Sequence, residues 1–140
     1  MLLLALTVGT LGPQPLVRAA LCPSARTTIE VDACLSAAVA KARMVLDRYR
    51  TAARRIAADG DNPAVLAAFD AGDRAWRTYE QASCNAVYVR WQGGTIRGAV
   101  FARCELRLIR LQMHTLWQDW LTYPDNTPSI LPEPIVETGV

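Results

Sequence analysis

The chain has 140 residues, 51% of them hydrophobic, which is enough for one domain with a single core and too few for two. Its 15 lysine and arginine residues are spread along the sequence and nearly balanced by 13 acidic residues, so the net charge of +2 does not build a polyanion-binding surface. Composition and charge therefore predict one small domain and argue against nucleic acid as a partner.

The N-terminal segment predicts export. The run from Leu2 to Leu11 is apolar and about ten residues long, which fits the hydrophobic region of a signal peptide and is about half of what a membrane-spanning helix needs. We expect residues 1–20 to be a signal peptide cut near Ala19 or Ala20, and the mature protein to be periplasmic or secreted without stable membrane insertion. Cys22 stands where a lipid could be attached, but Leu21 before it is larger than lipid-attachment sites use, which favours a soluble protein over a lipoprotein.

A first helix is expected over residues 29–58. Thr27 or Thr28 can cap it, and the acidic residues Glu30 and Asp32 favour the N-terminus of a helix. Apolar residues follow at steps of three and four, as an amphipathic helix requires. These residues are Val31, Leu35, Ala38, Ala42, Val45, Tyr49, Ala52 and Ile56.

A second helix is expected over residues 63–85. In the short linker before it, Gly60 can stop the first helix and Asp61 or Asn62 can cap the second. Phe69, Trp76 and Tyr79 recur at helical spacing on one face, so we interpret them as core side chains and this helix as the central one. The short linker makes the two helices antiparallel neighbours.

A third helix is expected over residues 96–121, with a broad apolar face that includes Leu111, Thr115 and Trp120. The predicted fold is therefore all-α, an antiparallel three-helix bundle occupying residues 21–121. Its predicted core includes Leu35, Tyr49, Phe69, Trp76, Tyr79 and Leu108. The proline-rich segment 122–140 is expected to be an extended or disordered tail without an assigned function.

The stretch before the third helix is the only irregular one expected inside the domain, and it has the residue types of a binding loop. Tyrosine, tryptophan and arginine are the types that dominate protein interfaces. The candidate partner-binding residues are Tyr88, Arg90, Trp91, Gly93, Gly94 and Thr95. The alternative is an ordinary helix connection with Trp91 folded inward.

Four cysteines in a small exported domain predict two disulfides. All four fall at one end of the bundle, and we expect the pairs Cys22–Cys84 and Cys34–Cys104, because Cys22 lies outside the first helix and can reach the end of the second. The cysteines have no C-x-x-C spacing and only His114 to help them, so no metal site is expected, and no cofactor either. No catalytic group is predicted, since His114 lacks a serine–carboxylate arrangement.

The combined pattern resembles the LprI lysozyme inhibitor family. It consists of Cys22, Tyr49, Trp76 with Tyr79, Cys84, the Gly93-Gly94-Thr95 turn and Cys104, and the resemblance covers about residues 22–116. The chain departs from the family pattern at Asp73, Glu80, Ile109 and Gln112. The resemblance implies an exported inhibitor whose loop end blocks a lysozyme.

Two function classes follow. The first is that lysozyme inhibitor, in which Arg90 would engage the catalytic carboxylates of the enzyme. The alternative is a non-catalytic interaction module of the cell envelope, which pairs with a protein partner or with itself as a homodimer through the face around Leu116, Trp117 and Trp120. An enzyme is not expected.

Overall fold

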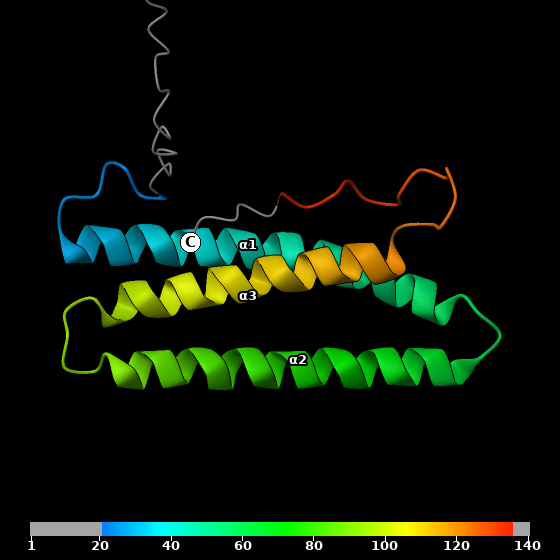
Figure 1. Ribbon diagram of the computed structural model, residues 1–140, viewed down its shortest axis with the longest axis horizontal. Helices are drawn as coiled ribbons and strands as arrows, with labels where there is room; N and C mark the ends of the chain where they lie inside the picture. The colour runs from blue at the N-terminus through cyan, green and yellow to red at the C-terminus, as the bar shows by residue number, and fades with distance from the viewer. Residues whose placement is uncertain (1–20, 136–140) are drawn as a thin grey trace, which may run out of the picture.

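The computed structural model describes residues 21–135, so the expected signal peptide lies outside the described residues. Its helices are α1 (Thr28–Ala58), α2 (Pro63–Arg90) and α3 (Arg97–Trp120). α1 and α3 lie side by side, with α2 along one side of this pair and the C-terminal segment along the other (Figure 1). The described part of the chain contains no strand, and the predicted all-α, antiparallel three-helix bundle is confirmed.

The start of α1 is fixed by its first turn. The Thr27 hydroxyl accepts a hydrogen bond from the Glu30 amide at 3.2 Å, and the Glu30 carboxylate accepts bonds from the amides of Arg26 at 2.7 Å and Thr27 at 3.0 Å. This reciprocal capping box satisfies amides that the helix itself leaves free. The same backbone hydrogen bonds hold the pKa of Glu30 below its usual range.

α2 is longer than expected and ends at Arg90 rather than at residue 85. Its last turn continues because Val87 packs against the buried cluster at Cys84, and because the Tyr88 ring meets the edge of Phe101 with centroids 5.8 Å apart. Tyr88 and Arg90 are therefore helical residues, and the expected loop of residues 88–95 is shortened to the connection 91–96.

The expectation that the second helix is the central one was wrong, because α3 has that role. α3 buries nine residues, whereas α2 buries only Phe69, Glu80 and Cys84. Tyr79, predicted to be core, is 55% exposed, and Trp76 is half-buried. The reason is that charged residues of α2 occupy inward positions opposite arginines of α1, which turns Tyr79 toward solvent.

The apolar core lies mainly between α1 and α3. Leu35 and Tyr49 are buried as predicted, but the face of α1 is rotated, so Val39 and Leu46 complete it while Ile56 is exposed. The buried apolar face of α3 is also narrower than expected, because Leu111 is 47% exposed. Leu108 is buried with the two cysteines of α2 and α3 in a second cluster.

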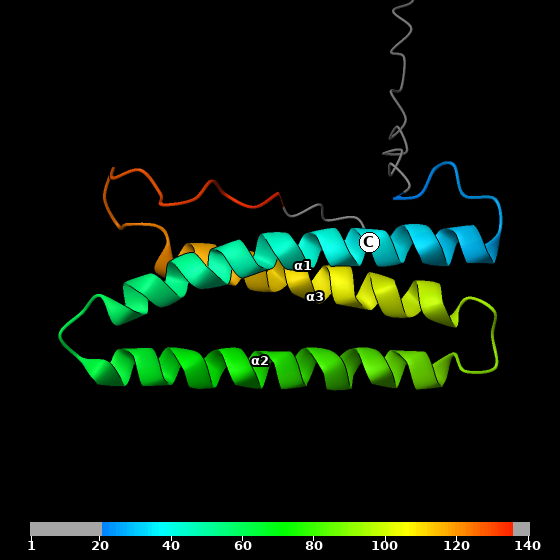
Figure 2. The same cartoon turned by 180° about the vertical axis from the view of Figure 1, so that it is seen from behind.

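Both disulfides lie at the end of the bundle that carries the 91–96 connection, but their pairing differs from the predicted one. Cys22 bonds Cys34, with an S–S distance of 2.09 Å, and Cys84 bonds Cys104 at 2.07 Å. Each bond closes a short stretch of chain, because the 21–27 segment folds back onto the first turns of α1 while α2 and α3 meet directly. The sulfur of Cys22 is thus taken by Cys34. We call this end, residues 21–34 and 84–104, the disulfide end (Figure 2).

The described part of the C-terminal segment is extended and packs on α1 and α3, so it is ordered by specific contacts rather than left in solvent. The Tyr49 hydroxyl donates to the Pro132 carbonyl at 2.7 Å, and the Trp117 indole donates to the Leu131 carbonyl at 3.0 Å. The Ile130 amide donates to the Leu121 carbonyl at 2.9 Å. Burial raises the pKa of Tyr49, which keeps this phenol a donor.

Candidate functional site

The disulfide end contains an open hollow of about 530 Å³ between the first turn of α1 and the 91–96 connection. Four of the six predicted partner-binding residues line it, namely Tyr88, Gly93, Gly94 and Thr95. The connection is tight, since the Gly94 amide donates to the Trp91 carbonyl at 2.8 Å. Within the described residues no glycine has a positive φ, so Gly93 and Gly94 do not form a left-handed turn.

Sequence reasoning missed the other side of this hollow. It is lined by Thr28, Ile29, Asp32, Arg97 and Gly98, whereas Gln92 lies in the connection itself, within the expected loop. The antiparallel topology was the available signal, because it places the start of the first helix beside the connection between the second and third.

Five of the 13 large hydrophobic side chains that are exposed in residues 21–135 belong to the disulfide end. Trp91 is 41% exposed, so the alternative in which it folds inward is not what the structure has. Large hydrophobic residues rarely gather on a free surface without an interaction to make. The exposed ones at this end are Ile29, Tyr88, Val89, Trp91 and Ile96.

Two arginines at this end differ in what they contact. The Arg97 guanidinium lies 5.8 Å from the Tyr88 ring centroid and donates to the Gln92 carbonyl at 3.0 Å, so it is held in place. Arg90, the last residue of α2, is exposed and makes no hydrogen bond or ion pair with any residue of the described chain. Arg90 is therefore available to a partner, although it does not line the hollow.

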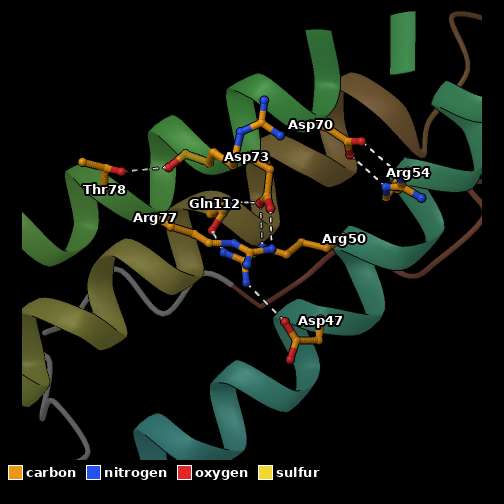
Figure 3. A network of polar contacts seen from close by, with 9 residues as sticks. Asp47, Arg50, Arg54, Asp70, Asp73, Arg77, Thr78 and Gln112 are labelled. Carbon is orange, nitrogen blue, oxygen red and sulfur yellow. Dashed lines mark hydrogen bonds and ion pairs between the residues drawn. The ribbon is translucent and has the colours of Figure 1, made fainter. Parts of the chain in front are cut away.

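A layer of ion pairs attaches the middle of α2 to the other helices. Arg50 of α1 donates to Asp73 of α2 at 2.8 Å and to the Gln112 side-chain oxygen of α3 at 2.7 Å, and Gln112 donates back to Asp73 at 3.1 Å (Figure 3). Arg50, Asp73 and Gln112 are all largely buried. This closed triangle joins all three helices.

A second pairing lies nearer the disulfide end. Arg43 of α1 binds Glu80 of α2 at 2.8 Å and Glu105 of α3 at 2.5 Å, beside a cleft of about 430 Å³. Burial opposes the charged guanidinium, but the hydrogen bonds and charges of Glu105 and Glu80 outweigh it and raise the pKa of Arg43. The Glu80 carboxylate has a paired cation in place of a solvent shell, which is how a charged residue is accommodated inside.

This ion-pair layer has a signature in the sequence. Arg43 and Arg50 are seven residues apart on α1, and Glu80 and Asp73 are seven apart on α2, in reverse order. Equal steps in opposite directions are what antiparallel helices need to pair side chains. The acidic residues were not recognised as inward-facing because they interrupt an otherwise aromatic stripe.

The α3 face predicted to bind a partner or a second copy is mostly covered within the chain. Trp117 is bonded to the C-terminal segment, and Trp120 meets the edge of Phe69 with centroids 5.0 Å apart. An apolar groove of about 460 Å³ remains between α2 and α3, with the half-buried Trp76 at its wall. The indole nitrogen of Trp76 is buried without a partner.

Asp70 and His114 are each engaged in a contact within the chain. Asp70 forms a two-bonded pair with Arg54, at 2.8 and 2.9 Å, which lowers the pKa of that carboxyl. A carboxyl held ionised in this way is unsuited to donate a proton. His114 packs against Trp117, with ring centroids 5.6 Å apart. Within residues 21–135 no three His, Cys, Asp or Glu side chains cluster as metal ligands, and no helix is both long and apolar enough to cross a bilayer.

Comparison with known proteins identifies the family. Neither a curated protein nor a solved structure matches the chain. The family model described as "Lysozyme inhibitor LprI" matches residues 22–116, which is about two thirds of the 140 residues and includes both disulfides and the 91–96 connection. Because this match covers most of the chain, and all of the disulfide end except its first residue, the protein belongs to the LprI lysozyme inhibitor family.

Proposed function

We propose that this protein is an exported inhibitor that binds a lysozyme through the disulfide end and blocks its cleft. The observation that carries the proposal is the set of five large hydrophobic side chains exposed around the 91–96 connection. Membership of a lysozyme inhibitor family supports a protein partner and a non-enzymatic role. Two disulfides fit an oxidising compartment such as the periplasm or the extracellular space.

The chemistry of Arg90 and Trp91 suits such a target. Lysozymes cleave glycosidic bonds with two carboxyl groups that flank the scissile bond. A guanidinium without an internal partner can form charge-assisted hydrogen bonds with a carboxylate, and Arg90 is such a group. Trp91, next to it and 41% exposed, supplies the kind of aromatic surface that anchors an interface.

The disulfides support this role by holding the binding surface in shape before it meets the enzyme. The Cys84–Cys104 bond joins α2 and α3 shortly before and after the 91–96 connection. The Cys22–Cys34 bond fixes the segment beside Ile29. A preorganised surface loses less conformational entropy on binding, so more of its contact energy appears as affinity.

An envelope interaction module that uses the α3 face is the weaker candidate. Trp117 and Trp120 make their contacts inside the chain, so little of the predicted α3 face is left for a partner. If the protein is such a module, sedimentation of the purified domain would show whether its partner is a second copy of itself.

The test is an assay of cell-wall lysis by a lysozyme with and without the mature domain. Wild type should inhibit, and Arg90→Ala and Trp91→Ala should each weaken inhibition by about 1 to 4 kcal/mol if these residues are interface hot spots. Both variants should keep the wild-type melting temperature within a few degrees, because both side chains are exposed.

Matched controls lie at the opposite end. Arg55 is likewise an exposed arginine in the last turn of a helix, and Tyr123 is an exposed aromatic, 46% accessible, after α3. Arg55→Ala and Tyr123→Ala should inhibit like wild type. Equal losses at both ends, or no inhibition by wild type, would overturn the proposal.

A further inference from the structure

One carboxylate at the disulfide end stands apart from the others. Five acidic side chains in residues 21–135 are at least partly buried, and four of them pair with arginine. The paired ones are Asp70, Asp73, Glu80 and Glu105. Asp32 is the fifth, and it has no hydrogen bond or ion pair, with its Oδ1 buried. A polar atom buried without a hydrogen-bond partner is costly, so this oxygen calls for an explanation.

The Asp32 carboxylate packs against the start of α3. A Cβ placed on Gly98 would lie 2.7 Å from Asp32 Oδ2, so the carboxylate packs directly on the backbone of the first turn of α3. No side chain caps that helix. The free amides and dipole at a helix N-terminus favour a negative charge nearby, although Asp32 forms no hydrogen bond with these amides.

The hollow does not supply a counter-ion of its own. Arg97 is the cation that lines it, but its guanidinium is used by the Gln92 carbonyl and the Tyr88 ring and makes no ion pair with Asp32. The hollow of about 530 Å³ is open, and the strongly exposed Ile29 stands at its edge. Asp32 is thus an unpaired carboxylate on the wall of a recess, inside the apolar surface proposed to bind the enzyme.

We infer that this recess receives a cationic side chain, arginine or lysine, from the partner protein, and that Asp32 is its counter-ion. The inference rests on the proposed function for the identity of the partner as a lysozyme. Closure of the apolar surface over the recess would remove water from the new pair, and a desolvated charge-assisted hydrogen bond contributes more than an exposed one. Arg90 and Asp32 then contact the enzyme with opposite charges at separate points.

The first experiment measures binding of a basic lysozyme to wild type, Asp32→Asn and Asp61→Asn. The Asn side chain has the shape of Asp without its charge. Asp61 is an exposed carboxylate without a partner in the α1–α2 linker, at the opposite end, so its variant has the same change in net charge. Asp32→Asn should weaken binding by about tenfold or more, and Asp61→Asn by less than about twofold.

The second experiment does not need a lysozyme. Nitrogen-15 correlation spectra of the mature domain are recorded during titration with capped arginine, capped lysine and capped citrulline, the last being a neutral analogue of arginine. Wild type should show saturable shifts at the amides of Gly93, Gly94 and Gly98 with a cationic probe and not with citrulline. Asp32→Asn should lose these shifts while its remaining spectrum and melting temperature stay like those of wild type.

The two experiments separate the failures. If wild type does not bind lysozyme but the charged probes shift the three glycines in an Asp32-dependent way, the proposed target is wrong and the cation site stands. If wild type inhibits lysozyme and Asp32→Asn binds as well as Asp61→Asn, the cation site is wrong and the inhibitor function stands. Shifts of equal size with citrulline, or in Asp32→Asn, would also overturn the cation site.

Discussion

The triangle of Arg50, Asp73 and Gln112 gives the sharpest test of how α2 is held. In the variant Asp73→Ala, the Arg50 guanidinium keeps Gln112 and the exposed Asp47 but loses its buried counter-ion. Arg50 and Asp73 side chains are only 13% and 12% exposed, so water cannot replace the lost partner well. Asp73→Ala should therefore lower the free energy of unfolding by more than the removal of any exposed ion pair of this protein.

The expected loss can be estimated from the structure. Breaking a buried ion pair by removing one partner costs about 3 to 5 kcal/mol. The contacts that Arg50 retains with Gln112 place Asp73→Ala near the low end, at about 3 kcal/mol. The pair of Asp73 with Arg77 adds at most about 0.5 kcal/mol, since Arg77 is exposed.

The assay is urea unfolding followed by helical circular dichroism, with Asp70→Ala as the matched control. Asp70 lies one turn earlier on α2 and pairs with Arg54 through two bonds, but that pair is exposed, so its loss should be several-fold smaller. The double variant Arg50→Met with Asp73→Leu should recover part of the stability, because no unpaired buried charge remains, although the buried Gln112 amide loses both partners. Equal losses for Asp73→Ala and Asp70→Ala, or a double variant as unstable as Asp73→Ala, would refute this reasoning.

Three further predictions concern stability. Replacing Cys84 and Cys104 together by alanine should cost about 3 kcal/mol, from the entropy of a loop that spans 20 residues, as measured by urea unfolding. Tyr49→Phe removes the hydroxyl that holds the C-terminal segment, and it should lower the free energy of unfolding by about 1 kcal/mol. A protease should then cleave that segment faster than in wild type, before it cuts the helices. The pKa values of Glu30 and Asp70 are lowered in the folded protein. Their contribution to stability is therefore present above the unfolded pKa values of about 4 and is lost as the pH falls through the lower folded values. Glu30→Gln and Asp70→Asn should each flatten the acid side of a profile of melting temperature against pH.

Each of these has an outcome that would contradict it. Non-reducing peptide maps that join Cys22 to Cys84 would remove the loop on which the disulfide estimate depends. Unchanged proteolysis in Tyr49→Phe would mean that the other contacts of the segment suffice. An acid-side slope that is the same in wild type and both carboxamide variants would show that other carboxylates dominate acid unfolding.

Much of the fold was determined by local sequence. The capping pattern at Thr27 and Glu30 and the linker before Pro63 define helix starts to within one residue, because caps act through bonds within a single turn. The end of α2 was missed because the residues after 85 favour strands, and the packing of Val87 at the Cys84 cluster and of Tyr88 on Phe101 keeps them helical.

The candidate site was predicted in part for the same reason. Tyr88, Gly93, Gly94 and Thr95 are close in sequence and do line one hollow, whereas Asp32 and Gly98 reach it from two other helices and have no local signal that joins them. The disulfide pairing was wrong because a position at a common end does not choose among three possible partners. That choice depends on how the 21–27 segment turns back on α1.

The sequence by itself determined that this is a helical, two-disulfide domain of the LprI type, since helix periodicity, caps and cysteine count are properties of the chain. The tertiary structure alone decided which helix is central, which way Tyr79 points and which carboxylates are paired. Asp73 and Glu80 could turn inward only because α1 presents Arg50 and Arg43 at matching heights, and a buried charge is tolerated only where its partner arrives from another part of the chain.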